Sequence, residues 1–279
     1  MLTSSRAPQV TAARRLAKRA FRQADRRFLV EGAQAVREAL GAVEREPGGL
    51  HELFCTPAAA DRYAGVLERA VAAGVPVTLV STEVLATLAT TVTPQGLVAV
   101  AGFRDIGLAE ALAGKPRLVV VLASVRDPGN AGTVLRTADA AGADAVVFTS
   151  ASVDAYNGKC VRASAGSLFH LPHVVGVPVG DAIAAIRAAG LAVLAAAGDG
   201  EVDLDSPAET GGLARPTCWV LGNEAWGLPT AVREVADRAV RVPIHGRAES
   251  LNLAAAAAVC LYASARAQRA PGGCRAGEG

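Results

Sequence analysis

Three polar segments of this sequence each follow a run of apolar residues, and together they could bind and activate a small ligand. Asn130 and Arg136 follow the run 118–122, the segment LGNEAWGLP occupies 221–229, and VPIHGRAESLN occupies 242–252. Glycines in such loops let a backbone approach a ligand closely. Open α/β sheets bind ligands where their parallel strands end. The three segments therefore predict one site at the carboxyl edge of a parallel sheet.

The elements that position the first segment are predicted by the stretch 117–148. Leu118–Leu122 is Val-rich and reads as a buried parallel strand. A polar loop follows, and then a helix over about Ala131–Ala141 that ends at Gly142. The apolar run Ala145–Phe148 returns as the next strand. This strand, loop, helix and strand form the unit on which the prediction depends.

Arg136 lies among Ala, Val and Leu in that helix, and an unpaired guanidinium in a core is costly. A functional role explains its presence there. The alternative is a helix-capping Asn130 and an Arg136 that faces solvent, and this segment alone leaves both open.

The composition indicates a globular protein with an anionic partner. Hydrophobic residues make up 51% of the 279 residues and charged residues 19%, enough apolar material for a substantial core. The net charge is only +2, but residues 1–27 hold eight Lys and Arg against one acid. A basic arm on a nearly neutral body indicates nucleic acid as partner. The alternative is a solvated, frayed terminus.

The cysteines and the apolar segments indicate the cellular compartment in which the protein is expected. The five cysteines have no metal-ligand spacing and form no cluster with the four histidines, so we expect no metal and a reducing cytoplasm. No N-terminal apolar core of a secretory signal is present. The apolar segment 251–265 is too short to span a bilayer, so we expect no membrane association.

The remaining pattern predicts two α/β sections. A first section alternates short strands and helices from residue 28 to 103, and a segment with Gly107, Gly114 and Pro116 separates it from the second. The expected domains are 1–108, with the basic arm, and 115–269, followed by a disordered tail at 270–279. The range 28–40 is expected to form a strand and then a helix, which Glu31 and Gly32 separate, and 152–171 is expected to be polar and then helical. Further strands and helices are expected at these positions: 51–55, 58–73, 75–80, 82–88, 97–103, 181–189, 191–197, 217–221, 229–236, 238–242 and 251–269.

Taken together, the motifs resemble the SpoU/TrmH class of the SPOUT RNA methyltransferases. The segments NAGTVLRTADAAGAD, LGNEAWGLP and VPIHGRAESLNLAAAAAV carry the resemblance, and DAYNGKCVRASAGSLF also fits the pattern. The first section is similar, through RRFLVEGAQAVREAL, to the substrate-binding domain often joined to that class. The resemblance covers most of the chain.

The resemblance implies a fold, an activity and partners that periodicity does not give. The implied fold is α/β, with a trefoil-knotted parallel-sheet SPOUT domain behind a small α/β RNA-binding domain. The implied activity is methyl transfer from S-adenosylmethionine to a ribose 2′-hydroxyl of RNA by a homodimer, most simply on 23S ribosomal RNA. The alternatives are a tRNA methyltransferase, an antibiotic-resistance methylase of the same class, and a non-catalytic RNA-binding or ribosome-assembly protein. A nucleotide-binding oxidoreductase is disfavoured because no GxGxxG follows the strand.

The resemblance also assigns residues. It implies catalytic roles for Asn130, Arg136, Glu224, Ser250 and Asn252, and a mostly backbone cofactor cradle at Leu221, Gly222, Val242, Ile244 and Leu251. We expect Glu224 to orient Asn130 or Asn252, and Ser250 to cap the last helix. Lys159 and Arg162 are candidate phosphate contacts, and His245 is a candidate substrate contact.

Arg136 is the residue whose role is least settled by the resemblance. An Arg side chain is a poor general base because its pKa exceeds about 12. We favour stabilisation of developing negative charge over proton abstraction. The subunit that supplies Arg136 stays open.

Overall fold

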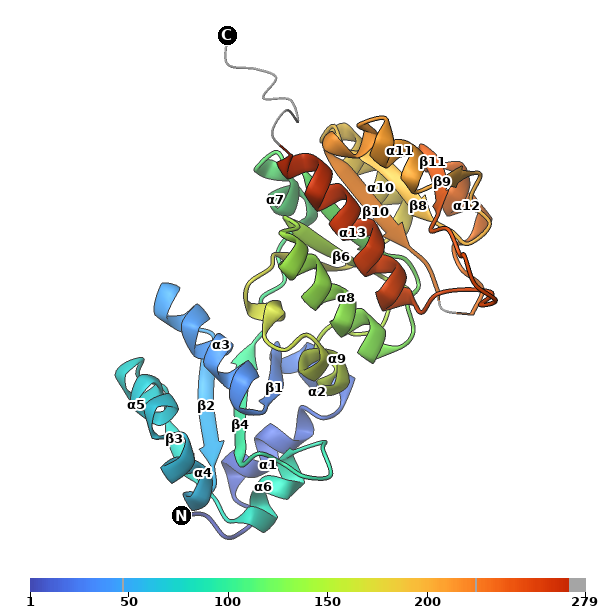
Figure 1. The fold of residues 1–279 in the computed structure, drawn as a ribbon. Coiled ribbons are helices and arrows are strands. Elements are labelled where there is room, and N and C mark those ends of the chain that lie inside the picture. The colour runs from blue at the N-terminus through green and yellow to red at the C-terminus, as the bar shows by residue number, and fades with distance from the viewer. Residues whose placement is uncertain (47, 224, 271–279) are drawn as a thin grey trace. The chain divides into compact units, whose positions relative to one another are not determined.

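The computed structural model describes residues 1–46, 48–223 and 225–270, and its contacts divide the chain into two compact units (Figure 1). The first unit comprises 1–104 and 154–170, and the second comprises 105–153 and 171 onward. The segment 154–170, which the sequence analysis placed in the second section, thus packs within the first unit. The expected tail at 270–279 lies, from 271 on, outside the described residues. The domain limits at 108 and 115 stay a prediction.

Within the described residues, the first unit has a four-stranded sheet of order β1-β4-β2-β3, in which β4 runs antiparallel to β1 and β2 and the β2–β3 pair is parallel. Its elements are α1 (Pro8–Arg15), α2 (Arg19–Asp25), β1 (Arg27–Glu31), α3 (Ala33–Arg45), β2 (Leu50–Cys55), α4 (Pro57–Arg62), α5 (Ala64–Ala72), β3 (Val77–Leu79), α6 (Thr82–Leu88), β4 (Leu97–Gly102), α9 (Gly158–Ala163) and the short 3-10 helix η1 (Ser167–Phe169).

The basic arm is folded rather than frayed. Helix α1 buries Val10 and Ala13 in the same core as Val98 and Val100 of β4. Seven of the eight Lys and Arg of residues 1–27 lie at the surface, and the eighth, Arg22, is buried. The arm therefore presents its charge from an ordered scaffold.

A buried ion pair and an aromatic cluster join the segment 154–170 to the first unit. Arg22 Nη2 lies 2.7 Å from Asp154 Oδ2, and both side chains are almost fully buried. The ring of Tyr156 stacks on Phe103 at 3.8 Å and lies 4.8 Å from Phe28. The Tyr156 hydroxyl accepts a hydrogen bond from the backbone N–H of residue 104 at 2.8 Å. The first unit is thus completed by a distant part of the chain.

Within its described residues, the second unit has a seven-stranded parallel sheet of order β7-β6-β5-β10-β8-β11-β9, which confirms the predicted α/β class. Its elements are α7 (Leu108–Ala113), β5 (Leu118–Leu122), α8 (Pro128–Ala141), β6 (Ala145–Thr149), β7 (His173–Val177), α10 (Val179–Ala188), β8 (Ala192–Ala196), β9 (Val202–Asp203), α11 (Asp205–Glu209), the 3-10 helix η2 (Gly212–Ala214), β10 (Thr217–Leu221), α12 (Thr230–Glu234), β11 (Arg238–Arg241) and α13 (Leu253–Arg269).

The central strands are apolar on both faces because helices cover the sheet. Every residue of β5, β6 and β10 is buried. On one face Val119, Val193 and Val220 pack with Ile183 and Ile186 of α10. On the other face α13 packs along α8, which lies beside it in Figure 1, and Trp219 donates a hydrogen bond to Ser264 of α13 at 2.9 Å.

Two helix starts differ from those expected. Helix α8 begins at Pro128 rather than near residue 131, because the Asp127 side chain accepts a hydrogen bond from the N–H of Asn130 at 2.7 Å. Asn130 therefore lies in the first turn and is not the cap. Helix α13 is capped by Asn252, whose side chain accepts from the N–H of Ala254 at 2.9 Å, and not by Ser250. The predicted Gly142 end of α8 is confirmed, with a left-handed φ of 70°.

Candidate functional site

The carboxyl ends of three neighbouring strands, β10, β8 and β11, form the floor of a cavity in the second unit. Leu221 of β10 is paired with Ala196 of β8, and Ala196 is paired with Val240 of β11. All three residues line the cavity, which has a volume of about 460 Å³. That volume lies in the range of small-molecule sites. The site is at the edge of the sheet that the sequence predicted.

Most residues singled out in the sequence meet in this cavity. Its described lining comprises Asn130, Ala196, Ala197, Gly198, Leu221, Gly222, Asn223, Ala225, Gly227, Val240, Val242, Ile244, Ser250, Leu251, Asn252, Leu253 and Ala256. All five predicted cradle residues are among them, as are three of the five predicted catalytic residues. None of the described lining residues carries a charge.

The loop after β10 is a tight turn in which backbone approaches backbone. The N–H of Asn223 donates to the carbonyl of Gly227 at 2.8 Å, and the N–H of Gly227 donates back at 2.9 Å. A Cβ added to Gly222 would lie 2.5 Å from the carbonyl carbon of Gly227 and 2.7 Å from the nitrogen of Leu228. Only glycine fits there without a shift of the loop, so the shape of this cavity wall depends on Gly222 having no side chain.

Asn223 fixes this loop and was not singled out in the sequence. Its side chain is buried, donates from Nδ2 to the carbonyl of Ser124 at 3.0 Å, and accepts at Oδ1 from the N–H of Ala225 at 2.8 Å. It therefore ties the loop after β10 to the loop after β5. Its position between two predicted site residues, Gly222 and Glu224, was a usable signal. Glu224 itself lies outside the described residues.

Two asparagines close the side of the cavity that faces the helices. Asn252 Nδ2 donates to Asn130 Oδ1 at 3.2 Å, and this bond joins the N-terminal turns of α13 and α8. Because Asn252 Oδ1 already accepts from the N–H of Ala254, its amide has one orientation. Ser250 also lines the cavity and is exposed.

Arg136 is not where the sequence argument placed it. It is exposed on α8 and is not among the described residues that line the cavity. Six helical positions separate it from Asn130, which amounts to about 9 Å along the axis and about 120° around it. The neighbouring Ala, Val and Leu residues lie on the faces of α8 that pack against the sheet and α13. Arg136 lies on the remaining face, which is exposed.

The other candidate contacts lie elsewhere. Lys159 and Arg162 belong to α9 in the first unit, where Arg162 Nη1 lies 3.1 Å from Glu31 Oε2. His245 is exposed and is not part of the described lining. Among the described residues, no group of three His, Cys, Asp or Glu side chains is arranged to hold a metal ion. No helix in the described ranges combines the length and hydropathy of a membrane span.

Glu31 is an acid of the first unit whose pKa is lowered by its surroundings. Burial raises its pKa, but hydrogen bonds from Thr91 and Thr90 and the charge of Arg162 lower the pKa by more, so the net shift is below the usual value. The carboxylate accepts from the backbone N–H of Thr90 at 3.0 Å and of Thr91 at 3.2 Å. Glu31 thus connects β1, the loop after α6 and α9.

The thiols of Cys218 and Cys260 in the second unit are buried. Burial raises the pKa of Cys260 to about 12 and that of Cys218 further still. Thiols with raised pKa values are unreactive at neutral pH. These cysteines fill the core.

Comparison with known proteins gives the family. A model of the SpoU rRNA Methylase family matches residues 117–262, and one of the MRM3-like substrate binding domain matches residues 7–99. The 23S rRNA (guanosine(2553)-2'-O)-methyltransferase RlmP of Bacillus subtilis strain 168 is 35% identical over 84% of this chain and 87% of its own length.

Solved structures agree along nearly the whole chain. An AdoMet-bound rRNA methyltransferase from Sinorhizobium meliloti matches with a TM-score of 0.79 and 32% identity, over 95% of this chain and 96% of that one. The SpoU methyltransferase AviRb from Streptomyces viridochromogenes, in complex with the cofactor AdoMet, matches with a TM-score of 0.77 and 29% identity, over 93% and 98%. The resemblance drawn from the motifs is confirmed, and the chain belongs to the SpoU rRNA methylase family.

Proposed function

We propose that this protein transfers a methyl group from S-adenosylmethionine to a ribose 2′-hydroxyl of 23S ribosomal RNA in the cytoplasm. The observation that carries the proposal is the convergence of the three motifs on one cavity at the strand ends. The names of the relatives favour rRNA over tRNA, since the RlmP enzyme and the RlmB enzyme of Bordetella pertussis are both 23S rRNA 2′-O-methyltransferases.

The cavity suits this cofactor. Its floor and walls are mostly small or aliphatic, and its polar side chains are those of Asn130, Asn223, Ser250 and Asn252. Leu221, Gly222, Val242, Ile244 and Leu251 would hold the cofactor, in accordance with the cradle expected from the family. When bound, S-adenosylmethionine supplies an electrophilic methyl group on a sulfonium.

The chain's own residues position the acceptor and stabilise charge. We assign Asn130, Asn252 and Ser250, which all line the cavity, to the orientation of the ribose. Alignment of the reacting groups supplies much of the rate in such a transfer. Glu224 keeps its predicted role of orienting these amides. Arg136 is assigned to the negative charge that develops as the hydroxyl loses its proton.

The position of Arg136 leads us to propose a homodimer in which each cavity receives Arg136 from the partner. Exposed residues of α13 repeat at helical spacing as Ala255, Val259, Tyr262 and Arg266, and α13 packs along α8, on which Arg136 is exposed. Val259 is 43% and Tyr262 52% exposed, on a face with no covering element among the described residues of this chain. A second copy that covers this face would bring in a second Arg136.

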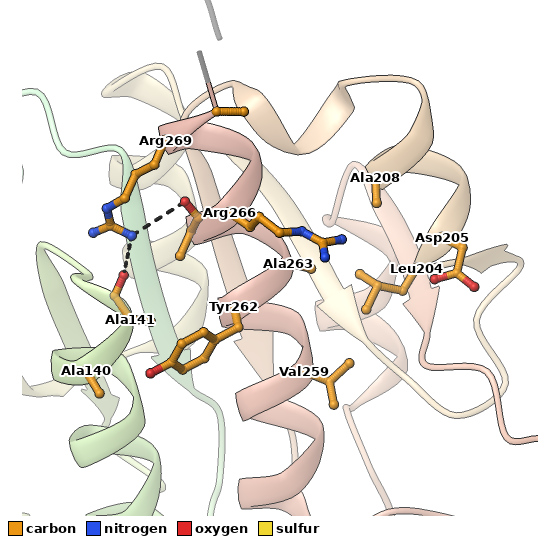
Figure 2. A pocket seen from close by; sticks show the side chains of 12 residues that line it. Ala140, Ala141, Leu204, Asp205, Ala208, Val259, Tyr262, Ala263, Arg266 and Arg269 are labelled. Carbon is orange, nitrogen blue, oxygen red and sulfur yellow. Dashed lines mark hydrogen bonds between the residues drawn. The ribbon is translucent and has the colours of Figure 1, made fainter. Parts of the chain in front are cut away.

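Figure 2 shows the hollow on that face, between α13, α8 and α11, with a volume of about 890 Å³. The Tyr262 side chain extends toward Ala140 and Ala141 of α8. Arg269 closes one end through a hydrogen bond from Nη1 to the carbonyl of Ala141 at 2.9 Å. We assign this hollow to the dimer interface. The trefoil knot expected from the family is part of the same proposal.

A mixing experiment tests the shared site. R136A has an intact cavity and G222A an intact Arg136, so we expect little activity from either alone when S-adenosylmethionine is kept below the weakened Kd of G222A. If each cavity uses the partner's Arg136, subunit exchange restores about a quarter of the wild-type rate, because about half of the dimers are mixed and each has one intact site. No recovery after verified exchange would show that Arg136 serves its own subunit or neither.

The activity itself is tested with RNA from cells that lack the gene. Labelled methyl groups should enter 23S rRNA at a ribose 2′-oxygen, with one site lost in the deletion strain and restored by the enzyme. Incorporation into tRNA only would overturn the rRNA substrate. No incorporation into either RNA, with RNA binding intact, would favour a non-catalytic assembly role.

A further inference from the structure

Trp226 is exposed and lies between two residues, Ala225 and Gly227, that line the cavity. Its side chain is 65% exposed, whereas Trp219, the other tryptophan, is fully buried and bonded to Ser264. Tryptophan is highly buried on average, so exposure of most of an indole calls for an explanation. The two backbone hydrogen bonds between Asn223 and Gly227 enclose it in a closed turn.

The neighbours of Trp226 place it at the mouth of the cavity. Ala225 and Gly227, on either side of it in the chain, both line the cavity, and Trp226 does not. Two further large apolar residues of the lining, Ile244 and Leu251, are 39% and 41% exposed. The mouth is therefore bordered by apolar side chains from two loops, and the indole lies outside the space that the cofactor would occupy.

We propose that Trp226 is the platform on which the base of the methylated nucleotide stacks. This inference rests on the proposed function, because it takes a ribose as the acceptor. A ribose whose 2′-hydroxyl reaches the cavity carries its base one glycosidic bond away, so the base must lie at the rim. Unpaired RNA bases stack on exposed aromatic side chains, and stacking tolerates any base. Trp226 thus positions the nucleotide without selecting its identity.

Stacking of a base on the indole contributes affinity for RNA, and a smaller side chain cannot supply this affinity. Loss of the indole in W226A should raise the KM for RNA by about 5- to 140-fold, the range equivalent to one stacked base. W226F retains an aromatic face and should recover most of that loss. The affinity for S-adenosylmethionine should not change in either variant. V235A is the matched control, since it removes another exposed apolar side chain of the second unit and should leave the KM unchanged.

Tryptophan fluorescence provides a readout independent of turnover. The difference between the wild type and W226F reports Trp226, because Trp219 is the one other tryptophan and is buried. The probe is 23S rRNA from cells that lack the gene. We expect this RNA to reduce the emission of Trp226 and its quenching by acrylamide, and S-adenosylmethionine alone to change neither.

Three results would overturn the stacking role. Protection of Trp226 by S-adenosylmethionine alone would assign the indole to the cofactor. Protection that appears with protein concentration, without RNA, would assign it to a subunit contact. A wild-type KM for W226A would show that no base rests on it. In each case methyl transfer by the wild type would leave the proposed function standing, whereas absence of methyl transfer by the wild type would overturn the proposed function and this inference with it.

Discussion

Replacement of Gly222 by alanine is the sharpest test of the cavity, because the clash it creates is with backbone. The added Cβ would lie 2.5 Å from the carbonyl carbon and 2.6 Å from the oxygen of Gly227. These atoms belong to the turn closed by Asn223 and Gly227, so no flexible side chain can move aside. Overpacking of this kind costs about 1–3 kcal/mol. For a unit of this size, that cost corresponds to a fall in Tm of about 2–12 °C.

The direction in which the loop moves decides the effect on binding. If the turn relieves the clash by moving into the cavity, a bound cofactor must push it back. The same free energy then appears as a loss of affinity for S-adenosylmethionine of about 5- to 140-fold. Isothermal titration gives the Kd, and differential scanning calorimetry gives the Tm. The matched control is G246A in the loop between β11 and α13, where an added Cβ would meet nothing within 4 Å.

Gly222 does not shape the cofactor site if G222A binds S-adenosylmethionine as tightly as G246A and the wild type do. A lower Tm with unchanged affinity would lead to the same conclusion, because the turn would then be close-packed without forming the wall of the cofactor site.

Three further predictions concern stability. D127A removes the cap of α8 and should lower the free energy of unfolding by about 1 kcal/mol in urea melts. R22A leaves Asp154 buried and uncompensated and should cost about 3–5 kcal/mol, whereas the double variant R22M/D154L should recover most of this, as measured by the same melts. Because the pKa of Glu31 is lowered by folding, its contribution is present above about pH 4.5 and is lost as the pH falls through the lowered value. E31Q should therefore flatten the acid limb of stability below about pH 4.5, and an unchanged limb would contradict the assignment.

The strands of the site could be predicted from sequence because their burial is continuous. The runs at 118–122 and 217–221 are apolar at every position but Thr217, and the structure has β5 and β10 at these bounds. The order of the strands could not be predicted in the same way. Strand β10 lies between β5 and β8, and these pairings join segments far apart in the chain. Periodicity describes each strand and carries no information about its neighbour.

Apart from Asn223, the cavity residues that the sequence did not reveal are those without distinctive side chains. Ala196, Ala197 and Gly198 line it after β8, but small residues at a strand end resemble any other turn. The choice of Asn252 over Ser250 as helix cap has a similar origin. Both residue types cap helices well, and the path of the loop after β11 decides which of them meets the first free N–H groups.

The displacement of Arg136 from the cavity has a more general cause. Two residues in one motif are read as parts of one site, yet a helix turns about 100° per residue. Asn130 in the first turn of α8 lines the cavity, while Arg136 faces away from the core of its own chain. A motif on such a helix therefore directs its side chains to different sides. In a dimer, side chains of the motif from the two chains can meet in one site. The exposure of Arg136 is thus the observation behind the proposed two-chain site, because the charged group to which we assign a role in the transfer does not line the cavity of its own chain.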